Sequence, residues 1–300
     1  MAKIRDILTI LLFCAAIAPL SAKGGATGND FLISFTDARP AALSGAFVAT
    51  ASGISSIFIN PAGIAASKIS ELSIIHNIDL FDRATEHLSF SIPFQDFSLG
   101  LSATYGYTSN FVEIDEYGDR QGMVSNYDYI VCVSISEQFM GWFAGGINFK
   151  YFGSYLYKHS KNGLAVDFGA LLWYDIFKFG VSIQNLGTQS AFINTVDALP
   201  VIIRTGIGIK TMLNKTDYFS AEAGAVIPAE VTDEKSFNAG AEWFALGMFA
   251  LRAGVNLYEE SGLFISLGAS LNTENFNFEY TLGSVNNSNK SHRMGITCIF

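Results

Sequence analysis

Two residues that could transfer an acyl group stand close together in the sequence. His87 and Ser89 are two positions apart, and a histidine that takes a proton from a serine hydroxyl can activate it as a nucleophile. Residues two apart on one strand face are about 6 to 7 Å apart, because each residue advances a strand by about 3.3 Å. That distance exceeds hydrogen-bond reach, and alternation places no acidic residue nearby to orient the histidine. The sequence therefore predicts that the protein is not an enzyme.

The remaining histidines and glycines indicate no inorganic or nucleotide chemistry. His76, His159 and His292 do not have the spacing of a metal site. No glycine-rich loop opens a helix as a phosphate-binding loop does. The net charge of -9 also argues against a nucleic-acid partner, which requires a basic face. We expect no cofactor, no metal and no nucleic acid.

Ten charged residues of both signs fall at alternating positions within otherwise apolar segments. They are Lys150, Asp167, Lys178, Arg204, Lys210, Glu222, Glu242, Arg252, Glu279 and Arg293. Ionisable groups at membrane depth are costly unless they face a polar interior, so we expect all ten to point into a lumen. There they either form a solvated network that holds an interior segment or line a path for a ligand.

The elements that carry these charges are long strands. The chain has 300 residues, of which 50% are hydrophobic and 15% charged, against about 25% charged in soluble proteins. Period-2 alternation runs from about residue 69 to 300 and predicts fourteen strands, separated by loops and tight turns in alternation. The predicted strands are 69–78, 85–94, 96–107, 123–136, 141–153, 162–174, 176–185, 200–211, 216–227, 235–245, 247–257, 262–273, 275–283 and 290–300.

The strand lengths and the aromatic residues favour a membrane barrel over a soluble sandwich or propeller. Strands of this length match the roughly 9 to 11 tilted residues that cross a membrane. Aromatic pairs such as Trp142-Phe143 and Trp243-Phe244 lie at strand ends, and the chain ends on Phe300 in an apolar strand. The predicted fold is an all-β, 14-stranded antiparallel transmembrane β-barrel formed by residues 69–300.

The first 22 residues have the pattern of a secretory signal peptide. Lys3 and Arg5 precede an apolar run that ends at Ser21-Ala22, and the run is shorter than the roughly 18 to 20 residues that span a bilayer. We expect cleavage after Ala22. The mature chain then keeps two cysteines, Cys132 and Cys298, predicted to face the lumen and the lipid respectively.

Residues 23–68 are rich in Ala, Gly and Ser and lack long alternation. Asp37 and Asn60 can each cap a short helix, and Pro61 suits the first helical position. Side chains of the strands can fill the interior of a barrel of up to about eight strands. The lumen of a fourteen-stranded barrel is wider, so we expect a plug to fill it. We expect residues 23–68 to be a hatch in the lumen.

The N-terminal segment resembles that of a known family. Ala38-Arg39, Ala41-Ala42, Gly45-Ala46 and above all Asn60-Pro61-Ala62-Gly63 look like the hatch of FadL-type outer-membrane transporters for hydrophobic compounds. The resemblance is closer still to the PorV/PorQ-type relatives and to the uncharacterised FadL-like proteins of spirochaetes. It implies an outer-membrane location in a Gram-negative-type or spirochaete cell, contact with outer-membrane lipid, and a hatch motif at Asn60, Pro61, Ala62 and Gly63.

The resemblance implies two functions. The first is passive uptake of small hydrophobic molecules such as long-chain fatty acids. The second is PorV-like docking or assembly of exported proteins, which the polar loop 108–122 slightly favours. The candidate ligand contacts are three large apolar residues of the hatch and three arginines that could bind a carboxylate: Phe58, Ile59, Ile64, Arg39, Arg204 and Arg252. Loops 108–122 and 186–199 are expected outside the cell, with both termini in the periplasm.

Overall fold

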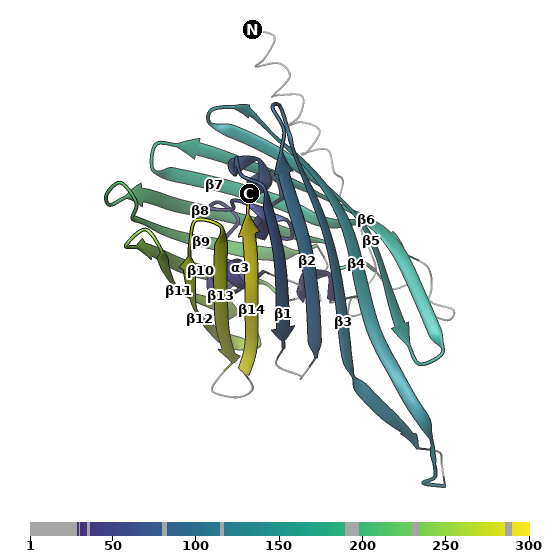
Figure 1. Ribbon diagram of the computed structural model, residues 1–300. Helices are drawn as coiled ribbons and strands as arrows, with labels where there is room; N and C mark the ends of the chain where they lie inside the picture. The colour runs from purple at the N-terminus through teal and green to yellow at the C-terminus, as the bar shows by residue number, and fades with distance from the viewer. Residues whose placement is uncertain are drawn as a thin grey trace.

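Alternating apolar and polar residues produce a closed antiparallel barrel. The computed structural model describes residues 29, 31–34, 37–79, 83–114, 117–189, 198–229, 234–285 and 290–300. Within these residues fourteen strands pair in sequence order, and β1 pairs with β14 to close the ring (Figure 1). The prediction of an all-β, fourteen-stranded barrel is confirmed. The predicted signal peptide, residues 1–22, lies outside the described residues.

The strand bounds agree with the predicted ones over most of the ring. The strands are β1 Glu71–Ile78, β2 Ala84–Pro93, β3 Ser98–Ile114, β4 Arg120–Met140, β5 Phe143–Leu156, β6 His159–Tyr174, β7 Phe177–Gln189, β8 Ile202–Met212, β9 Tyr218–Pro228, β10 Ser236–Ala245, β11 Phe249–Tyr258, β12 Gly262–Asn272, β13 Phe276–Val285 and β14 Lys290–Ile299.

Two predicted loops are largely strand, and a third begins as strand. Loop 108–122 is replaced by the ends of β3 and β4, loop 154–161 by a two-residue turn between β5 and β6, and β7 runs into 186–199 as far as Gln189. The β3–β4 hairpin extends well beyond the rest of the ring (Figure 1). Polar residues such as Glu113 hid these strands, because the prediction relied on an alternating apolar face.

The two faces of the strands differ in the way the alternation predicted. On β11, Leu251 and Val255 are exposed whereas Arg252 and Asn256 are buried. All ten charged residues predicted to point inward lie on the buried face, where each is buried or half-buried. Cys132 is also on that face, and Cys298 is on the opposite one.

Short helices precede the strands. They are α2 Phe31–Ser34, α3 Ala38–Ala42 and the 3-10 helices η1 Ile54–Ser56 and η2 Pro61–Ala66. Asn60 caps η2, since its side-chain oxygen accepts the Ala62 N–H, but Asp37 makes no side-chain capping bond to α3. Among the described residues, no helix has the length and apolar character needed to cross a membrane.

Candidate functional site

Residues 37–67, here called the N-terminal segment, are bound to the buried face of the strands by side chains of the barrel wall. Three consecutive carbonyl groups accept hydrogen bonds from side chains of two strands. Asn148 of β5 donates to the Ile57 carbonyl at 2.7 Å, Gln184 of β7 to Phe58 at 2.8 Å, and Ser182 of β7 to Ile59 at 2.7 Å. These bonds satisfy backbone acceptors that lack a partner within the short helices.

The opposite part of the wall holds α3. Thr281 of β13 donates to the Ala38 carbonyl at 2.8 Å, and Ser266 of β12 donates to the Ala42 carbonyl at 3.0 Å. The segment therefore contacts strands on both sides of the ring, and the α3 ribbon is seen behind β12–β14 (Figure 1).

Wall glycines allow the segment to approach the strands backbone to backbone. A Cβ atom on Gly146 of β5 would lie 2.5 Å from the Ala62 nitrogen and from the Pro61 carbonyl carbon. A Cβ atom on Gly254 of β11 would overlap the backbone at Leu43 and Ser44. Only a residue without a side chain fits these two positions, so the glycines set the distance between segment and wall.

The predicted hatch motif lies in the middle of this contact. Asn60 is fully buried and donates from its amide nitrogen to the Val48 carbonyl at 2.9 Å and to the Ala170 carbonyl of β6 at 3.1 Å. Its oxygen caps η2, so one side chain joins two parts of the segment to the wall. Pro61, Ala62 and Gly63 are buried as well.

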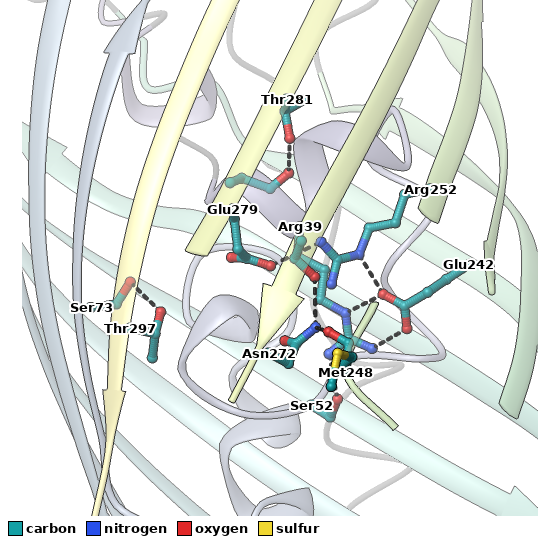
Figure 2. Close-up of polar contacts among 12 residues, drawn as sticks. Arg39, Ser52, Ser73, Glu242, Met248, Arg252, Asn272, Glu279, Thr281 and Thr297 are labelled. Carbon is teal, nitrogen blue, oxygen red and sulfur yellow. Dashed lines mark hydrogen bonds and ion pairs between the residues drawn. The ribbon is translucent and has the colours of Figure 1, made fainter. Parts of the chain in front are cut away.

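Four charged side chains form a network between α3 and the wall (Figure 2). Glu242 of β10 accepts two hydrogen bonds from Arg39, at 2.9 and 2.7 Å, and one from Arg252 of β11 at 2.5 Å. Arg252 also donates to Glu279 of β13 at 2.9 Å, and the Tyr218 hydroxyl donates to Glu242 at 2.7 Å. Arg39 is part of α3, and the other three side chains belong to β10, β11 and β13. The network therefore attaches α3 to these three strands electrostatically.

A second carboxylate holds the segment by its backbone. Glu222 of β9 accepts hydrogen bonds from the amides of Val48, Ala49 and Thr50, at 2.6, 3.0 and 2.7 Å. It also accepts the Thr50 hydroxyl at 2.8 Å. A carboxylate with several amide donors is a strong, directional contact. The alternation of residues along the strands predicted that Glu222 and Glu242 point inward, but no sequence signal indicated which group each would bind.

Among the described residues, the three apolar ligand contacts predicted from the sequence belong to two buried clusters. Phe58 and Ile64 belong to one buried apolar cluster and Ile59 to another. The Phe58 ring packs edge-on against His87, with ring centroids 5.3 Å apart, and the Lys150 ammonium lies 5.6 Å from its centre. His87 bonds to Thr104 at 2.8 Å, not to Ser89.

The three predicted arginines differ in their partners. Arg39 and Arg252 share Glu242, as described above. Arg204 of β8 donates through Nε to Gln184 at 3.0 Å, and no carboxylate of the described residues lies within ion-pair distance of it. Near it, the buried Asn238 of β10 has neither side-chain polar atom in a hydrogen bond to the described residues.

The cavities beside the segment are small. One of about 140 Å³ is lined by Arg39, Arg252 and Glu279 of the network. Another of about 220 Å³ lies near the tight turns and contains Lys178 and Lys210. An apolar hollow of about 600 Å³ is lined largely by outward-facing residues of β8–β12, including Ala221, Ala239 and Ala253.

One protein-family model matches part of the chain. An uncharacterised protein family, UPF0164, matches residues 21–163. No curated protein matches the sequence.

Solved structures match nearly the whole chain in fold. The toluene transporter TbuX of Ralstonia pickettii has a TM-score of 0.58 at 12% identity, over 89% of this chain and 97% of that one. The monoaromatic hydrocarbon channel CymD has a TM-score of 0.67 at 11% identity, over 88% and 97%. A Pseudomonas aeruginosa FadL homologue has a TM-score of 0.57 at 10% identity, over 88% and 98%. The shared property is the fold.

Proposed function

We propose that the protein is an outer-membrane β-barrel for passive uptake of small hydrophobic molecules. The observation that carries this proposal is the closed ring of fourteen strands with an exposed apolar face and a buried polar one, in the same fold as TbuX and CymD. Both of those proteins are described as carrying aromatic hydrocarbons. Passage of hydrophobic solutes is therefore the function that the fold supports best.

The apolar side chains on the outer face of the barrel support a membrane location. Large apolar side chains are exposed all around the ring, for example Ile74, Leu101, Phe149, Leu251 and Ile296. Exposed apolar surface of this extent is typical of a membrane or partner interface. Closure leaves no unpaired strand edge, which is the condition for placing a sheet in lipid. An outer-membrane barrel with a cleaved signal peptide meets these requirements.

Aromatic residues support two membrane boundaries. Trp142, Tyr174 and Trp243 lie at the tight-turn ends of their strands and are exposed. Toward the other end, tyrosines of β3, β4 and β5 form a stack on the outer face, with Tyr127 and Tyr155 ring centroids 5.0 Å apart. Tyr and Trp concentrate at membrane interfaces, so the two groups delimit the proposed lipid-facing band.

We propose that the N-terminal segment is the hatch of this barrel. Its hydrogen bonds to β5, β7, β12 and β13 place it against the inner wall, and Asn60 to Gly63 lie at its centre. A solute can pass only if part of the segment shifts. The bonds of Asn60 to Val48 and Ala170 must then break or move with it.

Long-chain fatty acids are our proposed substrates, with aromatic hydrocarbons as the main competitor. A fatty acid brings a carboxylate, which needs a cation that is not already neutralised. Glu242 and Glu279 neutralise Arg39 and Arg252, whereas Arg204 has only the neutral Gln184. Among the three candidate arginines, Arg204, with Asn238 beside it, is therefore the best placed to bind a head group, and Phe58, Ile59 and Ile64 remain candidates for the apolar chain.

A docking role for exported proteins, as in PorV-like proteins, is the second candidate. The projecting β3–β4 hairpin favours it, because a long arm outside the membrane presents a surface that small solutes do not need (Figure 1). The inside of the barrel does not distinguish the two roles.

One purification tests both proposals. The barrel is isolated in mild detergent from cells that make it naturally, and is examined by native mass spectrometry and lipid extraction. Bound fatty acid or another apolar molecule, released in proportion to protein, supports uptake. Stable exported proteins without such a ligand support docking. A barrel that carries neither, and binds no fatty acid or toluene in titration, contradicts the uptake proposal.

A further inference from the structure

The cavity near the tight turns has a composition unlike the rest of the interior. Its volume is about 220 Å³, and both Lys178 of β7 and Lys210 of β8 line it. The segment contributes Thr50 and Ser52, and no carboxylate residue is part of the lining. The cavity is therefore positively charged, although a fourteen-strand interior offers several acids that could have neutralised it.

Neither lysine forms an ion pair with any residue that the structure describes. In the described part of the chain, neither Nζ atom makes a hydrogen bond or an ion pair. Each ammonium instead lies over an aromatic ring: that of Lys178 is 5.5 Å from the centre of Trp173, and that of Lys210 is 4.0 Å from the centre of Tyr218. By contrast, Lys150, Arg39 and Arg252 are all in ion pairs.

Two half-buried ammonium groups that have no ion pair with the described residues gain stability if an anion binds between them. Each ammonium carries three hydrogen-bond donors. The attraction between a cation and an aromatic ring replaces only part of the hydration free energy that the ammonium loses on burial. Two neutral donors also reach this cavity. Ser52 accepts a bond from Arg39, which leaves its hydroxyl proton free, and the Gln138 amide makes one long bond of 3.5 Å to Gly141. The side chains that line the cavity thus include two ammonium groups and two neutral donors but no carboxylate.

We propose that this cavity binds an oxyanion, either a carboxylate or a phosphate group, between Lys178 and Lys210. The volume admits a head group but not a whole amphiphile, so any attached chain extends away from it. Because Ser52 belongs to the segment, the bound anion bridges the segment to β7 and β8. The source is either a free anion such as phosphate or the head of a fatty acid. The site does not depend on transport and goes beyond the proposed uptake.

The test uses the fluorescence of Trp173, which the Lys178 ammonium covers. In a full-length W142F/W243F background, Trp173 is the one remaining tryptophan. Phosphate, laurate and the neutral dodecanol are titrated separately against folded protein, and the binding of phosphate and laurate is repeated by calorimetry on the unsubstituted chain. The variant K178Q/K210Q removes both charges without shortening the side chains much. K215Q, in the exposed turn after β8, is the matched control.

We expect saturable binding of phosphate or laurate, weakened at least about tenfold in K178Q/K210Q and within about twofold in K215Q. Binding of phosphate alone assigns the site to free anions, and binding of laurate alone assigns it to head groups. If neither anion binds, or if K178Q/K210Q binds as tightly as the unsubstituted chain, the proposal is wrong. Laurate and dodecanol binding that is equal and insensitive to the substitutions also overturns it. Phosphate binding in a protein that transports nothing would leave this site intact and refute uptake alone.

Discussion

At the scale of single residues, Glu242 joins the most partners in the charge network. Its carboxylate accepts hydrogen bonds from Arg39, Arg252 and Tyr218. Glu242→Gln keeps the shape but leaves two buried arginines with Glu279 as their one remaining carboxylate in the network. Removing one partner of a buried ion pair costs about 3 to 5 kcal/mol. We expect Glu242→Gln to unfold at a lower midpoint urea concentration than the natural chain. Unfolding is measured by the heat-modified mobility of the barrel on gels.

The matched control is Glu274→Gln, in the exposed turn between β12 and β13. It should leave the midpoint unchanged. Equal midpoints for the two variants would show that the network contributes nothing to holding α3.

Asp37 makes stability depend on pH. Burial, with a smaller contribution from the negative charge of Glu279, raises the pKa of the Asp37 carboxyl from 3.8 to about 7. The folded chain then binds a proton that the unfolded chain releases, so folding stability falls as pH rises from about 4 to about 7. The loss is on the order of 4 kcal/mol for a shift from 3.8 to about 7. Urea midpoints across this range should fall for the natural chain and fall much less for Asp37→Asn.

Asp96→Asn, in the exposed turn between β2 and β3, is the control for Asp37. Its pH profile should match that of the natural chain. A flat profile for the natural chain would contradict the assignment of a proton to buried Asp37.

Prediction from the sequence succeeded for the strand face on which a residue lies, because the two-residue periodicity of a strand determines it. Alternation placed Cys132 and all ten inward charges on the correct face, because a strand has only two faces. It could not assign Glu222 to the amides of 48–50 or Glu242 to Arg39, since those contacts join positions about 170 to 200 residues apart. The unpaired state of Lys178 and Lys210 is equally invisible in the sequence.

At the scale of elements, the fit between the segment and the wall depends on glycine. A Cβ atom on Gly146 would lie 2.5 Å from backbone atoms of Pro61 and Ala62. Gly146→Ala must therefore displace η2 or β5, at a cost of about 1 to 3 kcal/mol. We expect faster hydrogen exchange of amides in residues 57–66, measured by mass spectrometry, with strands far from β5 unaffected.

Gly141→Ala supplies the comparison, because a Cβ atom there meets nothing within 4 Å. This variant should exchange like the natural chain. If Gly146→Ala does so too, the segment is not held against β5 in the way described.

The extended β3–β4 hairpin is an element that hydrophobic alternation did not predict. The interpretation of 108–122 as a loop was wrong because membrane alternation was the only signal used, and β3 and β4 continue past the last outward tyrosines. We predict that the hairpin lies outside the cell. A protease site inserted after Tyr117 should be cut in intact cells, and one inserted after Asn214 should be cut only after the outer membrane is opened. The reverse pattern would invert the topology.

At the scale of the whole molecule, the proposed function is passage of hydrophobic solutes through the barrel. The most direct measurement is uptake of labelled oleate and toluene by cells that lack their own transporter for such compounds and carry this protein in the outer membrane. We predict uptake of at least one of the two well above that of cells with an empty vector, with no increase for a sugar of similar mass. If cells with the correctly folded barrel take up no more of either solute than cells without it, the proposed uptake of hydrophobic molecules is wrong.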